Sequence, residues 1–291
     1  MKLLFVSSLE RSGSTILDLK LSAYSNVVSL GEVWRVIKPH GASLDSVLAR
    51  ECTCGESADS CSYWAPVLDR IKQLGDNADL EQRYAALIEI TSELYGEDAV
   101  VIDSSKSIQV LQSLQSLSET DVRVLYTIRD VRGWMDSIRK AEKRKKEMPW
   151  GKIFEPDFKD FWISYLRHNI LRSLPLWLPH EWLLRNNRLQ RHVKRSGFQS
   201  MSLSYEALVF DTENVMSGIE NFAGLRNYEN GGESPRREMH IIRGNRTAFT
   251  SAPDAPLYYG AQWMSKWRWS AMISFLPWVS KYNKRNVYYF L

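Results

Sequence analysis

Cations and hydroxyl groups stand together at three places in this sequence, each directly after a short apolar run. The first is the segment SLERSGST (8–15), which follows the run LLFVS (3–7). Its glycine permits close backbone approach, and its hydroxyls and the N–H groups of a helix start attract phosphate. It is not the G-x-x-x-x-G-K-[ST] loop of nucleoside triphosphatases, because Arg11 precedes the glycine where that loop has a lysine after it. We therefore expect an anion site of a different type here.

The other two places lie further along the chain. The segment DSSK (103–106) follows the apolar run AVVI (99–102), and Arg129 follows the run VRVLYTI (122–128). Eight residues separate Arg129 from Ser137, so a helix that begins directly after the strand carries the serine hydroxyl about two turns along. The arginine and the hydroxyl can then reach one phosphate.

Apolar residues at helical spacing follow all three segments, which makes three strand-loop-helix units. This pattern predicts an α/β fold of three layers, with a parallel sheet of about four or five strands flanked by helices. Ligands of such sheets bind beyond the carboxyl ends of the strands. We therefore expect Arg11, Lys106 and Arg129 to line one site.

The organisation of the chain is expected to be simple. We expect a single domain over residues 1–291, with a cysteine-bearing insertion at about 33–75 and an aromatic-rich C-terminal segment at about 250–291. The further predicted elements are a helix over 80–95, a strand over 199–203, and a helical segment over 158–195 with breaks at Pro175 and Pro179.

Charge and hydropathy exclude some classes of function. The net charge is +4, which suits an anionic ligand but is too small for a protein that coats nucleic acid. No apolar stretch reaches the roughly 18 residues that a membrane span needs, so we expect a soluble, cytoplasmic protein. The basic run EKRKKE (142–147) is expected to be a solvated helix end, and nucleic acid is not an expected partner.

The three segments together resemble a known family. RSGST (11–15) after a first strand looks like the 5′-phosphosulfate loop of sulfotransferases that use 3′-phosphoadenosine 5′-phosphosulfate (PAPS), especially the bacterial, carbohydrate and tyrosylprotein branches. IRD (128–130) with Ser137 is similar to the family's 3′-phosphate motif. VIDSSK (101–106) looks like its second strand with the lysine that contacts the sulfuryl group, and SYEAL (204–208) resembles its Y-E-x-L motif.

This resemblance implies a P-loop kinase-like architecture and transfer of a sulfuryl group from PAPS to a hydroxyl on a carbohydrate, lipid or other small molecule. The product would be adenosine 3′,5′-bisphosphate (PAP), and no metal is required because arginines and a lysine neutralise the charge. Arg11, Lys106 and Glu32 are the implied catalytic residues. The implied donor-binding residues are Arg11, Ser12, Gly13, Ser14, Thr15, Ser105, Arg129, Ser137, Tyr205, Gly244, Asn245 and Arg246.

The acceptor hydroxyl needs a base, and Glu32 is the candidate. Cytosolic small-molecule members of the family carry a histidine two residues after the lysine, but here that residue is Ile108. In the tyrosylprotein branch the base is a glutamate beyond the first helix, at a separation similar to that of Glu32 from Arg11. The competing interpretation is a surface or capping glutamate near Arg35, in which case His40 or another histidine would be the next candidate.

The late segment RGNRTA (243–248) resembles the family's loop over the 3′-phosphate, but Ala248 stands where that loop has an arginine. Arg246 or Arg243 is the candidate replacement, and the alternative is an exposed basic turn. Two other classes of function also stay open. A P-loop kinase would need magnesium and a lysine that the first loop lacks, and a non-catalytic anion- or glycan-binding protein would not need Glu32 or Lys106.

Cysteines, histidines and C-terminal aromatics complete the candidates. Cys52, Cys54 and Cys61 are expected to be free thiols or a local disulfide in preference to a metal site, because no fourth ligand is obvious beyond the nearby His40. His240 has no partner spacing and is expected to pack or to face water. The tryptophans and tyrosines after residue 250 are expected to be core packing, with an acceptor cleft or, less favoured, a peripheral membrane contact as alternatives.

Overall fold

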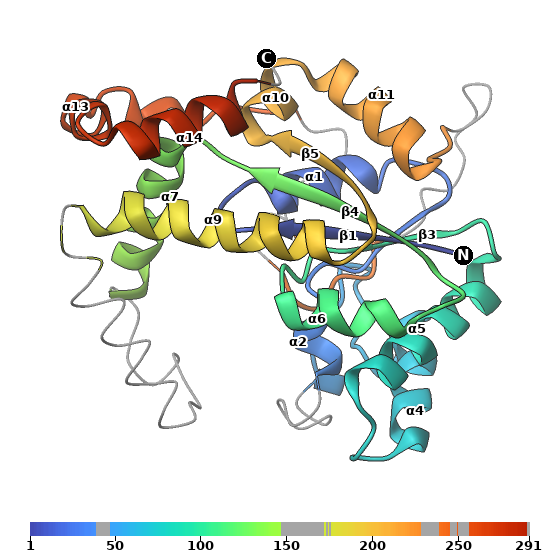
Figure 1. Ribbon diagram of the computed structural model, residues 1–291. Helices are drawn as coiled ribbons and strands as arrows, with labels where there is room; N and C mark the ends of the chain where they lie inside the picture. The colour runs from blue at the N-terminus through green and yellow to red at the C-terminus, as the bar shows by residue number, and fades with distance from the viewer. Residues whose placement is uncertain are drawn as a thin grey trace.

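The computed structural model describes residues 1–38, 47–146, 172, 174, 176–227, 239–244, 249 and 256–289. Within these residues five parallel strands form one sheet in the order β2-β3-β1-β4-β5 (Figure 1). The predicted three-layer α/β fold is confirmed. The strands are β1 (Lys2–Ser8), β2 (Val27–Ser29), β3 (Val100–Asp103), β4 (Asp121–Ile128) and β5 (Gln199–Ser204).

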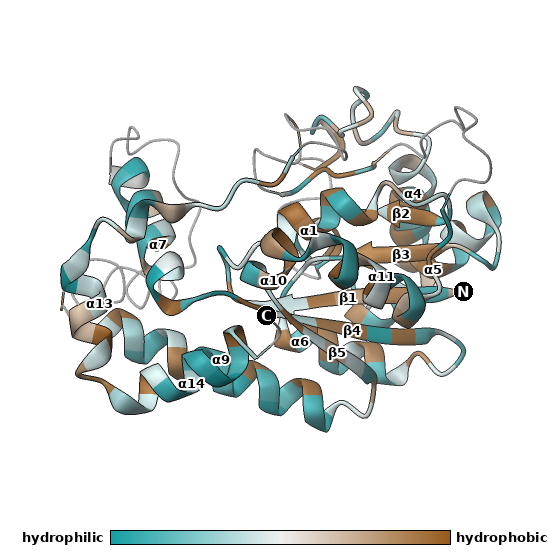
Figure 2. Ribbon diagram, turned by 90° about the horizontal axis from the view of Figure 1, so that it is seen from above, coloured by the Kyte–Doolittle hydropathy of each residue, from teal (hydrophilic) through white to brown (hydrophobic). Residues whose placement is uncertain are grey.

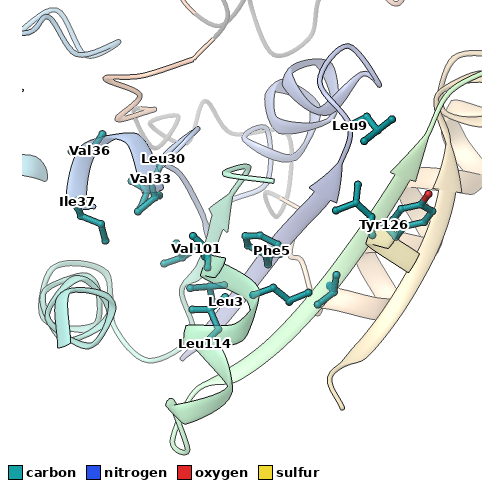
Figure 3. Packing of buried hydrophobic residues seen from close by; sticks show 14 of the residues in the cluster. Leu3, Phe5, Leu9, Leu30, Val33, Val36, Ile37, Val101, Leu114 and Tyr126 are labelled. Atoms are coloured by element: carbon teal, nitrogen blue, oxygen red, sulfur yellow. The ribbon is translucent and has the colours of Figure 1, made fainter. Parts of the chain in front are cut away.

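Strands β1 and β3 and most of β4 are near-continuous apolar runs because helices cover both faces of the sheet, whereas the edge strand β5 (QSMSLS) is largely polar. In the central strand β1, Leu3 and Phe5 belong to one buried cluster, and Leu4 and Val6 belong to the other. This alternation is the two-residue period of a strand. Figure 3 shows Leu3, Phe5 and residues of the neighbouring strands packed in the larger cluster.

Helices from distant parts of the chain supply the two outer layers. The larger cluster receives residues from α2 (Trp34–Ile37), α4 (Trp64–Leu74), α5 (Leu80–Tyr95), α6 (Ile108–Ser113), α7 (Val131–Lys146), α9 (Trp177–Arg195), α13 (Trp267–Ser274) and α14 (Pro277–Val287). The smaller cluster receives residues from α1 (Ser14–Leu21), α10 (Tyr205–Phe210) and α11 (Thr212–Ala223). Short 3₁₀ helices are η1 (Leu114–Ser116) and η6 (Ala261–Trp263).

The hydropathy of the elements follows the layers. Strands β2 and β3 and much of β1 and β4 are apolar, whereas β5 and the surrounding helices carry many hydrophilic residues (Figure 2). Among the described residues, no helix combines the length and the apolar character that crossing a bilayer demands.

Local sequence signals explain the start of α5, which has the predicted bounds. The Asp79 side chain accepts the backbone N–H of Gln82, and the Gln82 side chain accepts the backbone N–H of Asp79. This reciprocal capping box satisfies two N–H groups that would otherwise lack partners at the helix start.

The predicted break at Pro179 is wrong. Helix α9 begins at Trp177 and continues through Pro179 to Arg195. The proline is the third residue of the helix, where the backbone N–H has no partner within the helix and its loss costs nothing. The predicted break at Pro175 and the predicted helical residues 158–171 lie outside the described residues.

Candidate active site

A cavity of about 700 Å³ lies beyond the carboxyl ends of the strands. Segments that follow all five strands contribute to its lining, because parallel strands end at the same edge of the sheet. The expected site residues that line it are Arg11, Gly13, Ser14, Thr15, Glu32, Ser105, Lys106, Arg129, Ser137, Tyr205 and Gly244. Ser12 is buried beside them. Asn245, Arg246 and Ala248 lie outside the described residues, as does His40.

The loop between β1 and α1 is shaped for an anion. Gly13 has a φ of 92°, and a Cβ atom there would lie 2.5 Å from the Tyr205 ring, so only glycine fits. No side chain caps the N-terminus of α1, where Ser14 and Thr15 face the cavity. The first N–H groups of a helix have no partners within it, and together with the helix dipole they attract negative charge.

Two of the expected cationic residues have unusual backbones. Arg11 has a φ of 68° and Lys106 a φ of 61°, and in the described part of the chain no other residue apart from glycine has a positive φ. Such conformations cost energy and tend to occur where function demands a particular side-chain direction. Both cations lie in the loops that line the cavity.

Three contacts hold Arg129, two through its side chain and one through its backbone. Its Nη1 donates to the carbonyl oxygen of Arg11 at 3.2 Å, and its guanidinium carbon lies 4.3 Å from the centre of the Tyr205 ring. Its backbone carbonyl accepts the indole N–H of Trp182 at 3.1 Å. Ser137, on helix α7, lines the same cavity. The predicted proximity of the arginine and the serine is therefore seen.

The segment directly after β5 supports the position of Arg129 through contacts with its guanidinium and with the next residue, Asp130. Tyr205 stacks on the Arg129 guanidinium, and both Glu206 carboxylate oxygens accept the backbone N–H of Asp130 at 3.2 Å. Burial, with the nearby Asp130 charge, raises the pKa of Glu206 to about 7. The Asp130 carboxylate in turn accepts hydrogen bonds from Asn283 and Tyr288 of the C-terminal region, at 2.8 and 2.7 Å.

Several buried polar atoms at the cavity lack a partner. Ser8 Oγ, Ser12 Oγ and Arg129 Nε are buried and make no hydrogen bond. Buried polar groups in native proteins are almost always paired, so a group of orphans beside a cavity indicates a polar ligand. A hydroxyl donates and a guanidinium donates, which matches the oxygens of phosphate or sulfate.

Glu32 lies between two cations. Its Oε1 is 2.9 Å from Lys106 Nζ, and its Oε2 is 2.7 Å from Arg35 Nε. The two loops that carry the carboxylate and the lysine are also joined by the backbone, since Ser104 N–H donates to the Gly31 carbonyl at 2.8 Å. The structure thus places Glu32 in contact with Lys106, and it also contains the Arg35 pair of the competing interpretation.

Ser105 has a structural bond besides its place at the cavity. Its Oγ accepts the backbone N–H of Trp34 at 2.7 Å and donates to the carboxylate of Asp103. Asp103 is buried and also accepts from the hydroxyl of Tyr84 at 2.6 Å. A second buried carboxylate, Asp18, accepts from the hydroxyls of Ser29 at 2.8 Å and Ser104 at 3.0 Å. Burial raises the pKa of both aspartates to about 6.

The sequence analysis did not identify a group of charged residues that also line the cavity: Glu10, Glu142, Arg172 and Arg185. Glu10 accepts hydrogen bonds from Arg185 at 2.5 Å and from Arg172 at 3.4 Å, and Arg172 also pairs with Glu142 and Glu181. Burial opposes ionisation of Glu10, but the hydrogen bond and the charge of Arg185, with a backbone hydrogen bond and the charge of Arg172, together outweigh burial and lower the pKa of this carboxyl. The arginines are 162 and 175 residues from Glu10, so no local spacing could have shown this network.

The aromatic C-terminal segment divides into two groups. Trp263 is buried, as expected, and the guanidinium carbon of Arg132 lies 4.2 Å from the centre of its ring. In contrast, Trp267 and Phe275 are 69% and 83% exposed. The core-packing interpretation is therefore correct for only part of the segment.

His240 is buried, which agrees with the expectation of packing, and it also has partners that spacing did not indicate. Its Nδ1 lies 3.2 Å from the Sγ of Cys61 and 4.0 Å from that of Cys52. None of the three cysteines is in a disulfide. The partner is 179 residues away in the chain, which is why spacing did not reveal it.

The sheet and its first loop define a class: a P-loop-like α/β protein with a cationic cavity at the carboxyl edge of a parallel sheet. Comparison with family models identifies the protein family within this class. The model described as "Sulfotransferase family" matches residues 4–230, and the chain therefore belongs to that family.

The chain is also similar to solved structures of sulfotransferases. The sulfotransferase domain from the curacin biosynthetic pathway is similar with a TM-score of 0.51 and 17% identity, over 87% of this chain and 84% of that one. The sulfotransferase from Alicyclobacillus acidocaldarius gives 0.46 and 13%, over 82% and 89%. Mouse sulfotransferase SULT7A1, solved in complex with PAP, gives 0.42 and 10%, over 99% and 86%. Comparison with curated protein sequences found no match.

Proposed function

We propose that this sulfotransferase takes its sulfuryl group from PAPS and transfers it to a hydroxyl group of a small molecule or glycan. One observation carries the proposal. A single cavity brings together an uncapped helix N-terminus with Arg11 and Lys106, and a second pair of anion-binding side chains, Arg129 and Ser137. PAPS has phosphate groups at its 5′ and 3′ positions, and two anion sites in one cavity match that distribution of charge.

The loop after β1 is the proposed site of the 5′-phosphosulfate. The N–H groups at the start of α1 and the hydroxyls of Ser12, Ser14 and Thr15 supply donors, and Arg11 supplies a planar fork of N–H groups. The unpartnered hydroxyl of Ser12 supports this assignment, because an anion oxygen would satisfy it. Gly13 keeps the loop close to Tyr205 and leaves the backbone accessible.

Arg129 and Ser137 are the proposed readers of the 3′-phosphate. Arg129 still has an unpartnered Nε, while Tyr205 and the Arg11 carbonyl fix the plane of its guanidinium. A guanidinium fixed in this way can donate to a phosphate without losing much rotational freedom. Gly244 lines the same cavity, and the remaining residues of the late segment, 245–248, lie outside the described residues.

The transfer requires that the donor and the acceptor are positioned in line and that the developing negative charge is neutralised. In-line transfer breaks the bond from sulfur to the bridging oxygen of the donor and forms a bond from sulfur to the acceptor oxygen, with negative charge on the oxygens in between. Lys106 is the proposed donor to that charge, and Glu32 is the proposed base that takes the acceptor proton. Their contact at 2.9 Å supports a shared place at the reacting groups. Arginine and lysine supply the positive charge, so the proposed reaction needs no metal.

A ligand-binding experiment tests the donor. PAP should raise the Tm clearly more than ATP with magnesium does, since a ligand at 100 times its Kd stabilises the native state by about 2.7 kcal/mol. Arg129→Ala should weaken PAP binding by at least tenfold. The matched control is Arg139→Ala, which removes an exposed arginine of the same helix α7 that does not line the cavity.

Two outcomes would overturn this assignment. Equal or greater stabilisation by ATP with magnesium would favour a kinase-like donor, and normal PAP binding by Arg129→Ala would remove the arginine from the site. Transfer is then tested with radiolabelled PAPS and a panel of sugars, lipids, phenols and peptides. PAP binding without sulfation of any acceptor in the panel would favour the alternative of a non-catalytic anion-binding protein.

A further inference from the structure

Three thiols and one imidazole lie close together near the end of strand β2, and none of them lines the cavity. The Sγ atoms of Cys52, Cys54 and Cys61 and a ring nitrogen of His240 all lie within 4.8 Å of one another. Cys52, Cys61 and His240 are buried, and Cys54 is partly buried. The cysteines come from the loop before α4, whereas the histidine comes from a segment about 180 residues later.

The distances fit a tetrahedral metal site. The Sγ of Cys61 is 3.7 Å from the Sγ of Cys54 and 3.7 Å from that of Cys52. A tetrahedral zinc ion with Zn–S bonds of about 2.3 Å holds its sulfurs about 3.8 Å apart. A disulfide would need about 2.05 Å between the two sulfurs, so neither pair is in bonding range.

The imidazole is oriented as a metal ligand is. Its Nδ1 faces the thiols, and its Nε2 lies 3.0 Å from the hydroxyl of Tyr95, which can accept the Nε2 proton. A partner on the far nitrogen fixes the tautomer and the ring orientation, as is usual for histidines that bind metals. The ring of Tyr63 stacks on the imidazole with its centre 5.4 Å away, and the backbone N–H of Trp64 donates to Cys61 Sγ.

We propose that Cys52, Cys54, Cys61 and His240 bind one zinc ion in a closed structural site. Three thiolates and one neutral imidazole are a ligand set that zinc takes in tetrahedral structural sites. Binding releases the thiol protons, and the four ligands leave no position for a substrate. The cavity lining does not include any of the four, so the metal would not contact the groups that react in sulfuryl transfer. The inference is independent of the proposed function.

The zinc site would fasten the segment 239–244 to the cysteine loop. Thr53 N–H donates to the Ile241 carbonyl at 3.1 Å, and the Trp64 indole donates to the His240 carbonyl at 2.6 Å. The other side of the segment meets the strand end, where His240 N–H donates to the Ser29 carbonyl at 3.1 Å.

The same segment supports the loop of the candidate base. Glu32 N–H donates to the Arg243 carbonyl at 3.0 Å, and a Cβ atom on Gly31 would lie 2.7 Å from the Ile241 side chain. The metal would thus help to position the loop that carries Glu32, through the segment 239–244, although none of its four ligands lines the cavity.

Metal content of the purified full-length protein is the direct test. Elemental analysis should find about one zinc per chain, and cobalt added to the stripped protein should give the visible absorption bands of a tetrahedral site with thiolate ligands. His240→Ala should lose the metal, whereas His240→Cys, which restores a fourth ligand, should keep it. His192→Ala, a control on helix α9 away from the cluster, should retain full zinc content.

The rescue by cysteine separates ligation from packing, because a role in packing alone would leave both His240 variants without metal. Zinc removal should also lower the Tm by several degrees without abolishing PAP stabilisation of the remaining folded protein. A metal-free native protein with three titratable thiols would overturn the inference, as would a disulfide found by mass spectrometry. Neither result would bear on the donor, which the PAP experiment tests separately.

Discussion

The substitution Glu32→Gln tests the mechanism most directly, because it keeps the shape of the side chain and removes its ability to take a proton. We expect turnover to fall by roughly 10²- to 10⁴-fold, the usual contribution of a general base. This corresponds to about 3–5 kcal/mol in the activation free energy. PAP binding should change little, since Glu32 is not among the proposed phosphate ligands.

The effect on stability should be much smaller. The Arg35 side chain that pairs with Glu32 is 63% exposed, and an exposed pair contributes at most about 1 kcal/mol to the free energy of unfolding. Lys106 is more enclosed, at 15% exposed, but an amide oxygen at position 32 still accepts its hydrogen bond. We therefore expect the Tm to fall by about 2–4 °C or less.

The assay is the rate of product formation from radiolabelled PAPS with an acceptor found in the panel, measured beside Tm and PAP affinity. Arg35→Gln is the matched control, since it breaks the same ion pair and leaves the carboxylate. It should retain turnover within a few-fold. The reasoning fails if Glu32→Gln stays fully active, or if both variants lose stability and turnover to the same degree, which would make Glu32 a structural ion-pair partner.

Three further predictions concern neighbouring groups. Lys106→Ala should reduce turnover by about 10²- to 10³-fold with a smaller change in PAP affinity, and an effect on KM alone would make the lysine a binding residue. Gly13→Ala should lower PAP affinity and the Tm together, because its methyl group would meet the Tyr205 ring; unchanged values in both measurements would show that the loop adapts freely. Glu206 has its pKa raised from 4.5 to about 7, so the native state binds its proton more tightly and stability falls as pH rises between these values. Glu206→Gln should remove on the order of 3 kcal/mol of that fall in denaturant unfolding at pH 5 and pH 8, and parallel pH profiles for the two proteins would contradict the assignment.

Most of the fold could be predicted from the sequence because its signals are local. The strands β1, β3 and β4 are buried on both faces and read as continuous apolar runs, and the start of α5 carries its own cap. Strand β2 is harder to detect, since Val27–Ser29 has only three residues and pairs with β3 alone. Val27–Ser29 is a strand because it forms hydrogen bonds with β3, and its own sequence is too short to show a strand pattern.

The clustering of cations at the cavity was predictable for the same reason. Arg11, Lys106 and Arg129 each follow a strand directly, so the topology of a parallel sheet places them together. Other features of the structure depend on contacts between distant segments. The Glu10 network and the pairing of His240 with Cys61 join residues more than 100 positions apart, and no periodicity or spacing records such contacts.

Several features that destabilise the protein without ligand lie together at the cavity. A buried donor or acceptor without a partner costs about 1–3 kcal/mol, and Ser8, Ser12 and Arg129 each have one. The positive φ angles of Arg11 and Lys106 add to this cost. An anion that satisfies these atoms would recover part of it on binding. The thermal shift with PAP should therefore shrink in Ser12→Ala, which removes one orphaned hydroxyl, while the Tm without ligand stays equal or rises. A Tm that falls in the absence of ligand would show that the hydroxyl already has a partner.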